Sequence, residues 1–186
     1  MALNVLDHHL NPHDSPKVGK LAEHTRIELR QGDGGSKVFL DGRDVTDAIR
    51  SPEVTRAVSA VSAVPVVREV MVREQQRLGE RGGVILEGRN IGTVVFPDAD
   101  LKFFMQADAG KRVLRRQKEL AARSVHVQLD ELAREIQERD QQDSERAVSP
   151  LRKADDAIVL DTSDLDIEEQ VAFIITKVQE LLAKKC

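Results

Sequence analysis

An arginine flanked by glycines marks the part of this sequence best suited to anion chemistry. The stretch 84–107, VILEGRNIGTVVFPDADLKFFMQA, begins with a short apolar run and turns polar at Glu87-Gly88-Arg89-Asn90. Arginine presents a planar fork that fits phosphate oxygens, and glycine lets the backbone approach a ligand closely. In open α/β sheets, ligands lie beyond the carboxyl ends of the strands. This stretch therefore indicates either an anion site after a buried strand or a strand followed by a solvent-exposed arginine.

The elements that must position this stretch are short strands and amphipathic helices. Short apolar runs at 84–87, 101–106 (interrupted by Lys102) and 157–160 predict buried strands. We expect the amino terminus to be a fragment of helix followed by loop to residue 24. Helical periodicity and start signals predict the remaining helices at 52–62, 66–78, 109–123, 130–142 and 165–184.

A β-hairpin is expected near the amino terminus. Residues 25–31 alternate in polarity, 32–35 read GDGG, and 37–40 continue as a second strand. The glycines predict a turn here and not a phosphate loop, because no Lys-Ser/Thr pair and no helix follow them.

The helix at 109–123, capped by Asp108, carries a cationic face. Arg112, Arg115 and Arg116 fall at i, i+3 and i+4 and therefore share one side. Such a face is either a solvated surface or a phosphate clamp. Because hydrogen bonds to charged groups contribute about 1.5–3 kcal/mol each, a few arginines suffice to hold a nucleotide.

Composition indicates a soluble, cytoplasmic, single-domain protein. Among 186 residues, 40% are apolar and 32% charged, and the net charge of −4 argues against a general nucleic-acid binder. No apolar run is long enough to span a bilayer, and no signal peptide is evident. A single cysteine, Cys186, excludes an internal disulfide and a Cys-based zinc site. No metal site is expected, and His8, His9 and His13 are interpreted as solvated loop histidines.

Three motifs, in order, make the chain similar to a known family. They are Ser59 with 66–69 (VVRE), GRNIGTVVFPDADLKFF from residue 88, and 138–151 (ERDQQDSERAVSPL) followed by ADDAIVLDT. The chain closely resembles bacterial cytidylate kinase over essentially its whole length. The resemblance implies a phosphotransferase that moves the γ-phosphoryl of ATP, with Mg²⁺, to CMP or dCMP. It also implies a monomer and an α/β, P-loop NTPase-like nucleoside monophosphate kinase core: one domain over 1–186, with a hairpin insert at 25–50 and a helical lid at 108–146.

The resemblance assigns roles to individual residues. It implies that Arg89, Arg139 and Arg146 are catalytic. Arg89 and Arg146 match the positions that hold the acceptor phosphate. Arg139 and Asp143 match the positions that orient the ribose and phosphate. Ser59, Arg68 and Asn90 fall at the base, and Arg112, Arg115 and Arg116 at the lid and the nucleotide phosphates. Without the resemblance, Arg68 would be interpreted as a surface residue that forms an i,i+4 ion pair, and Ser59 as a helix residue without a specific role.

At position 90 the sequence departs from the family pattern, which usually has Asp. An aspartate only accepts hydrogen bonds, whereas the amide of Asn90 also donates them. We therefore expect a weaker preference for cytosine over uracil.

The phosphate loop of the family is missing from this sequence. No GxxxxGK[ST] occurs, and neither Gly19-Lys20 nor Gly110-Lys111 is followed by Ser or Thr. Three readings stay open: a cytidylate kinase whose chain lacks its amino-terminal part, a non-catalytic CMP-binding pseudokinase, and an interaction module on the same fold. With the first strand of the family missing, we expect the strands at 84–87 and 101–106 not to be ladder neighbours.

Overall fold

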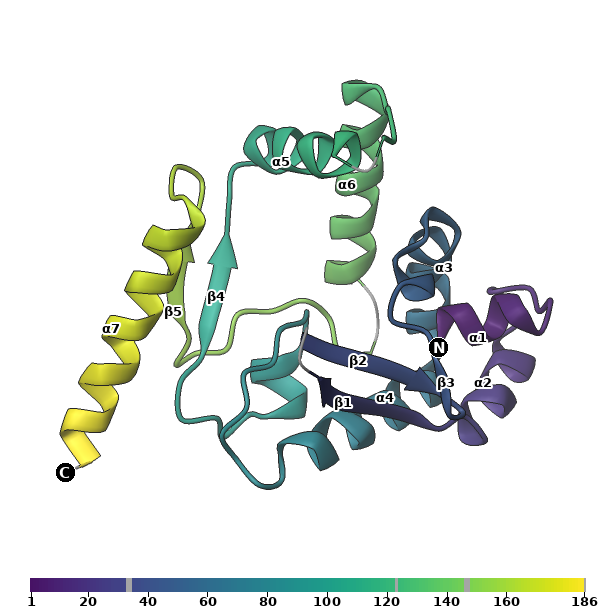
Figure 1. The fold of residues 1–186 in the computed structure, drawn as a ribbon, viewed down its shortest axis with the longest axis horizontal. Coiled ribbons are helices and arrows are strands. Elements are labelled where there is room, and N and C mark those ends of the chain that lie inside the picture. Colours follow the sequence, from purple (N-terminus) through teal and green to yellow (C-terminus); the bar gives the residue numbers. More distant parts are fainter. Residues whose placement is uncertain (33–34, 123, 146–147, 186) are drawn as a thin grey trace. The chain divides into compact units, whose positions relative to one another are not determined.

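A computed structural model describes residues 1–32, 35–122, 124–145 and 148–185 (Figure 1). The chain divides into two compact units. The first comprises Met1–Arg89 with Glu145–Pro150, and the second comprises Asn90–Ser144 with Leu151–Cys186. Over the described part of the chain, no helix combines the length and apolar character that crossing a membrane requires.

Four helices build the core of the first unit. The predicted helices at 52–62 and 66–78 are confirmed. The helix at 52–62 is capped at its start, because the Ser51 hydroxyl accepts a hydrogen bond from the Val54 N–H at 3.3 Å. Their apolar faces meet in one cluster that includes Val5, Val18, Val54, Val61 and Val67. The helices are α1 (Ala2–Asp7), α2 (Ser15–Glu23), α3 (Pro52–Ala63) and α4 (Pro65–Gly79).

The prediction of loop up to residue 24 was wrong, because α2 occupies Ser15–Glu23. The Asp14 carboxylate caps this helix by accepting from the Lys17 N–H at 3.2 Å, and a proline lies in its first turn. A Cβ added at Gly19 would lie 3.4 Å from Val66 Cβ. The glycine of the Gly19-Lys20 pair therefore allows α2 to pack closely on α4.

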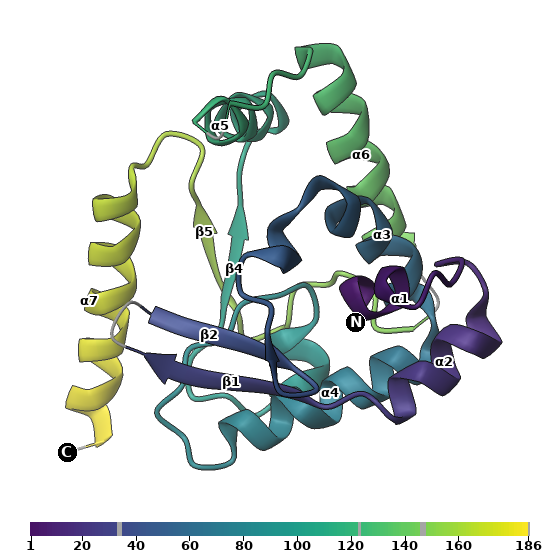
Figure 2. The same ribbon diagram turned by 45° about the vertical axis from the view of Figure 1, so that its right-hand side comes forward.

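The predicted hairpin is confirmed (Figure 2). Strands β1 (Ile27–Gly32) and β2 (Gly35–Leu40) pair antiparallel, with Ile27 opposite Leu40. The tip of the predicted turn, 33–34, lies outside the described residues. A short β3 (Arg43–Asp44) then pairs with β2, and the 3₁₀ turn η1 (Ala48–Arg50) leads to α3.

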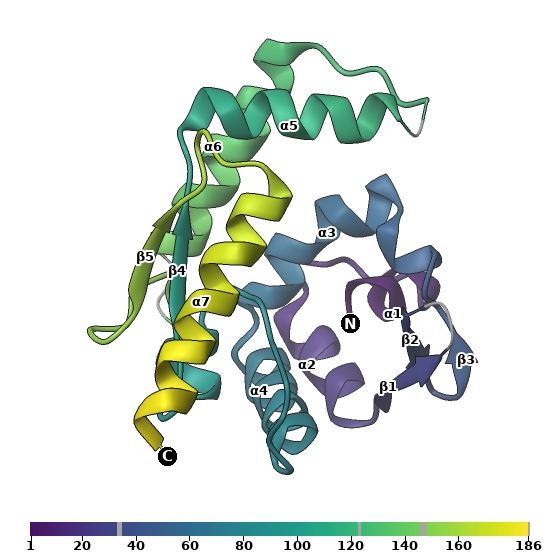
Figure 3. The same cartoon turned by 60° about the vertical axis from the view of Figure 1, so that its left-hand side comes forward.

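The second unit is built on a two-stranded parallel sheet (Figure 3). Strands β4 (Phe103–Gln106) and β5 (Ile158–Asp161) pair from Phe103↔Ile158 to Gln106↔Asp161. The C-terminal helix packs against this sheet, since the rings of Phe103 and Phe173 meet edge to face with centroids 6.3 Å apart. The remaining elements are the π-helical turn η2 (Ile91–Val95) and the helices α5 (Ala109–Ala121), α6 (Leu129–Glu145) and α7 (Ile167–Lys185).

The predicted buried strand at 84–87 was wrong. The segment has no strand conformation, and Ile85 is 97% exposed. A parallel strand is buried only when neighbouring strands pair with it and helices cover its faces, and no described strand pairs with this segment. The related expectation, that 84–87 and 101–106 are not ladder neighbours, is confirmed. Helix α7 packs on the sheet of β4 and β5, the two strands of this unit among the described residues. It exposes the apolar side chains of Ile167, Val171, Ile175, Val178 and Leu182.

Candidate acceptor-nucleotide and lid sites

Asn90 is the N-cap residue directly before the π-helical turn η2. Its backbone carbonyl accepts hydrogen bonds from the N–H groups of Val94 at 2.9 Å and Val95 at 3.3 Å. The residue is 9% exposed, and its side-chain nitrogen Nδ2 is buried with no hydrogen-bond partner among the described residues. A buried donor left unsatisfied costs about 1–3 kcal/mol, and π-helical turns occur frequently at functional sites. The turn thus holds a donor that an acceptor on a ligand would satisfy. Arg89, which precedes it, is half-buried.

Arg68 and Ser59 lie close to the junction of α3 and α4 in the first unit. Arg68 is 8% exposed, and its Nη2 donates to the Ser62 carbonyl at 2.7 Å. Ser62 in turn donates through its hydroxyl to the carbonyl of half-buried Ser59 at 3.1 Å. The alternative reading of Arg68 as a surface ion-pair partner was therefore wrong. Its guanidinium is held at the helix junction by the Ser62 carbonyl.

The end of α6 carries the predicted pair Arg139 and Asp143. One helical turn separates them, and Nε of Arg139 lies 4.0 Å from Oδ2 of Asp143. The Asp143 side chain is 9% exposed, whereas that of Arg139 is 45% exposed. The Leu151 N–H donates to the Asp143 carbonyl at 2.7 Å and so fixes the chain after the helix. Arg146 lies outside the described residues.

Two of the three lid arginines have acidic partners. Arg112 on α5 forms an ion pair with Asp140 on α6 at 2.5 Å, and Arg116 pairs with Glu119 at 3.0 Å. The first pair joins α5 to α6, the two helices of the predicted lid. Reasoning from the sequence assigned no role to Asp140, and the order of charges in 138–140 (ERD) was the only available signal.

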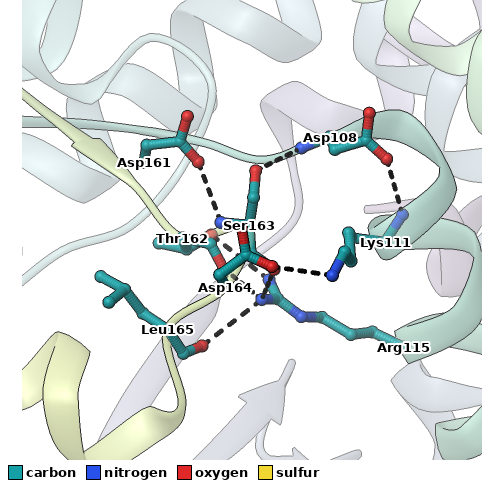
Figure 4. A network of polar contacts seen from close by, with 8 residues as sticks. All are labelled: Asp108, Lys111, Arg115, Asp161, Thr162, Ser163, Asp164 and Leu165. Atoms are coloured by element: carbon teal, nitrogen blue, oxygen red, sulfur yellow. Dashed lines mark hydrogen bonds and ion pairs between the residues drawn. The ribbon is translucent and has the colours of Figure 1, made fainter.

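Arg115 joins α5 to the loop that follows β5 (Figure 4). Its Nη2 donates to the carbonyl oxygens of Thr162, Ser163 and Leu165, the last two at 3.3 and 3.4 Å. The buried hydroxyl of Thr162 continues the network by donating to the Gln106 carbonyl at 3.1 Å. This geometry makes Arg115 an anchor between α5 and the loop after β5, a role that its helical spacing did not indicate.

Neighbouring charges complete the network around α5 (Figure 4). A hydrogen bond with Asp164 raises the pKa of Lys111, and a hydrogen bond from Ser163 lowers the pKa of Asp161. Within the described ranges, no group of three or more His, Cys, Asp or Glu residues is arranged to hold a metal ion.

Three of the seven acceptor-site residues that the sequence indicated are buried polar groups. Burying a polar side chain costs folding free energy unless the side chain finds hydrogen-bond or ion-pair partners. The buried polar and charged residues of the described chain are Asn4, Arg68, Asn90, Asp143 and Thr162. Three of these, Arg68, Asn90 and Asp143, were predicted to bind the acceptor nucleotide.

Comparison with known proteins identifies the family of this chain. The family described as Cytidylate kinase matches residues 1–180. The chain belongs to the cytidylate kinase family. Cytidylate kinases are phosphotransferases, so the resemblance seen in the three sequence motifs and the enzyme class that it implies are both confirmed.

Curated relatives cover most of this chain. A cytidylate kinase of Bacillus cereus (strain ATCC 10987 / NRS 248) is 45% identical over 179 residues, which is 96% of this chain and 80% of the relative. One of Limosilactobacillus reuteri (strain DSM 20016) is 44% identical over 98% of this chain and 82% of the relative. A bifunctional pantoate ligase/cytidylate kinase of Synechococcus sp. (strain JA-3-3Ab) is 47% identical over 92% of this chain, which spans only 32% of that protein.

Proposed function

We propose that this chain binds CMP or dCMP and acts in its ATP-dependent phosphorylation to CDP or dCDP. The observation that supports this proposal most strongly is the burial of Arg68, Asn90 and Asp143. Each falls at a family position for the acceptor nucleotide, and each is a group that a solvated surface would normally expose. We further propose that the protein works as a cytoplasmic monomer.

In the proposed site, arginines act on the acceptor phosphate. Phosphoryl transfer requires little covalent work of the protein, so positioning and neutralisation of charge account for most of the catalysis. Arg89 and Arg146 supply positive charge at the acceptor phosphate. Asp143, close to Arg139, accepts from the sugar hydroxyls, while Arg139 contacts the phosphate side.

The base is recognised through three further residues. Arg68 donates to the cytosine carbonyl and ring nitrogen, with its guanidinium already oriented by the Ser62 carbonyl. Ser59 contributes a hydroxyl that donates or accepts. Asn90 accepts from the amino group of cytosine through its amide oxygen, while its buried amide nitrogen is a donor for uracil O4. Both pyrimidines thus have a partner at Asn90.

The phosphoryl donor in this proposal is ATP with Mg²⁺. Magnesium is usually held by substrate phosphates, waters and one or two carboxylates, so it does not require a cage of protein ligands. Arg112, Arg115 and Arg116 fall at the family positions for the ATP phosphates. To contact them, Arg112 and Arg116 must exchange Asp140 and Glu119 for the phosphates, and Arg115 must leave the carbonyls of 162–165. The sequence contains no GxxxxGK[ST] loop to fix the β- and γ-phosphates of ATP. Electrostatic attraction that does not fix the position of these phosphates gives a much lower rate of phosphoryl transfer.

A coupled assay of ADP release tests this proposal, with CMP and Mg²⁺-ATP as substrates. We expect no more than trace turnover from the 186-residue chain. We expect turnover when the phosphate-loop segment of a relative is joined ahead of Met1. Rapid turnover by the 186-residue chain would contradict the assignment of the phosphate site. If neither protein turns over although CMP binds, a non-catalytic CMP-binding function is favoured.

A further inference from the structure

Lys102 is a half-buried lysine that the proposed function does not use. It interrupts the apolar run just before β4, and its side chain is only 8% exposed. The ammonium donates to both carboxylate oxygens of Asp156, at 2.9 and 2.7 Å, and also to the carbonyl of Pro97. A charged group that is shielded from water in part needs ion-pair and hydrogen-bond partners to offset the lost hydration. Lys102 meets this requirement through two different loops.

The aliphatic stem of Lys102 lies against the π-helical turn. A Cβ built at Gly92, inside η2, would lie 3.3 Å from Lys102 Cδ and 3.6 Å from its Cγ. The same Cβ would lie 3.8 Å from the Cβ of Ala154, in the loop that leads to Asp156. One side chain therefore contacts η2, the turn at Pro97 and the loop at 154–156.

The π-helical turn η2 depends on contacts with residues outside the turn. Its i→i+5 hydrogen bonds run from Val95 to Asn90 at 3.3 Å and from Phe96 to Ile91 at 2.7 Å. Such π-helical turns are rare, and the surrounding structure determines whether they form. Val95 supports η2 from within the unit, since it is 1% exposed. Lys102 supports it at Gly92, two residues after Asn90.

We propose that Lys102 is a positioning residue which, with Asp156, fixes η2 and thereby sets the direction of the Asn90 side chain toward the nucleotide base. The contact between Asn90 and the base rests on the proposed function. The support of η2 by Lys102 does not, because it follows from contacts within the second unit alone. A purely structural ion pair would add to the stability of the unit without acting through Asn90.

Two variants and one matched control separate these roles. Lys102→Met keeps the stem against Gly92 and removes the ammonium, while Asp156→Asn removes the partner charge at a side chain that is 64% exposed. Lys111→Met is the control, because Lys111 also forms an ion pair, with Asp164 at 2.7 Å, and belongs to helix α5. Thermal unfolding identifies any variant that fails to fold. If Lys102→Met does not fold, Asp156→Asn is used for the measurements below.

The first measurement is hydrogen exchange without ligand. We expect the amides of Val94, Val95 and Phe96 to exchange about tenfold faster or more in Lys102→Met and Asp156→Asn, because η2 opens locally. The amide of Ile158, which donates to the Lys102 carbonyl at 2.9 Å, should not change, and neither should any of these amides in Lys111→Met. Unchanged exchange in η2 would overturn the proposal whatever the chain binds.

The second measurement is a double-mutant cycle on CMP affinity. Lys102→Met should weaken CMP binding about tenfold, since misplacement of a contacting group is costly. In an Asn90→Ala background, the same change should have less than about a twofold effect, because Lys102 acts through Asn90. Additive effects would overturn the positioning role. Absence of CMP binding by the unmodified chain would instead contradict the proposed function, and the exchange data would still decide whether Lys102 fixes η2.

Discussion

The substitution Asn90→Asp tests how this chain discriminates between cytosine and uracil. Asn90 is 9% exposed, and its Nδ2 has no hydrogen-bond partner among the described residues. The substitution keeps the shape of the side chain and replaces the buried donor by an acceptor. A carboxylate accepts a hydrogen bond from the amino group of cytosine. It cannot donate one to uracil O4, which is itself an acceptor.

The size of the effect follows from the hydrogen bonds exchanged. A hydrogen bond to a charged group contributes about 1.5–3 kcal/mol, and leaving a buried acceptor unsatisfied costs about 1–3 kcal/mol. Since about 1.4 kcal/mol corresponds to a tenfold change in affinity, the ratio of CMP to UMP affinity should rise at least about tenfold. Burial raises the pKa of a carboxylate, so this gain should diminish as the pH is lowered and the group becomes a donor.

Calorimetric titration of both nucleotides into the unmodified chain and the variant measures this ratio directly. Thr93→Ser is a suitable control, because it retains the hydroxyl that donates to the Asn90 carbonyl at 3.4 Å and leaves the amide in place. An unchanged ratio in Asn90→Asp, with both proteins folded, would exclude Asn90 from the base site.

Three further substitutions test the phosphate site, the core and an ion pair. Arg89→Ala should weaken CMP binding by about 1.5–3 kcal/mol in calorimetry, because a charged partner of the phosphate is lost, and should leave cytidine binding unchanged. Val61→Ala should lower the free energy of unfolding in urea by about 1.5–3 kcal/mol, since Val61 is 2% exposed within the helical core, and a value near zero would contradict that packing. The Lys102 ammonium lowers the pKa of Asp156 below its ordinary value of 3.8, so their ion pair stabilises the fold above that pH and is lost as the pH falls through the lower, folded-state value. Asp156→Asn should therefore reduce the acid-induced fall in the thermal midpoint, and an identical pH profile would contradict the pairing.

Local signals in the sequence predicted much of the fold. Pro52 and Glu53 in the first turn of α3 and the Asp108 cap of α5 each marked the start of a helix, and the glycine-rich turn marked the hairpin. Asp14 was a signal of the same kind for α2, but the histidines and Pro12 before it suggested a longer loop. That helix was predictable, and its packing glycine, Gly19, was not.

The segment 84–87 shows the limit of such signals. Its composition suits a strand, but a strand in a parallel sheet exists only through neighbours, which a single run of apolar residues cannot reveal. The π-helical turn at Ile91–Val95 was missed for a similar reason, since the contacts of Lys102 and Val95 that support it come from tertiary packing.

The candidate site was indicated by motif order and not by any one residue. Periodicity alone treats Arg68 as a surface residue and Asp143 as one more acid on an acidic helix, whereas both are buried. The contacts of Arg115 with 162–165 join segments almost fifty residues apart, and no local pattern encodes them.

Binding of CMP by the unmodified chain is the most direct test of this account. Calorimetric titration should show one saturable site for CMP, with weaker binding of cytidine, which lacks the phosphate for Arg89, and of AMP, whose purine does not match the pyrimidine contacts of Arg68 and Asn90. The folded chain is verified in the same preparation by its thermal transition. A folded chain that binds no CMP, or that binds AMP as tightly as CMP, would contradict the assignment of an acceptor-nucleotide site to these residues.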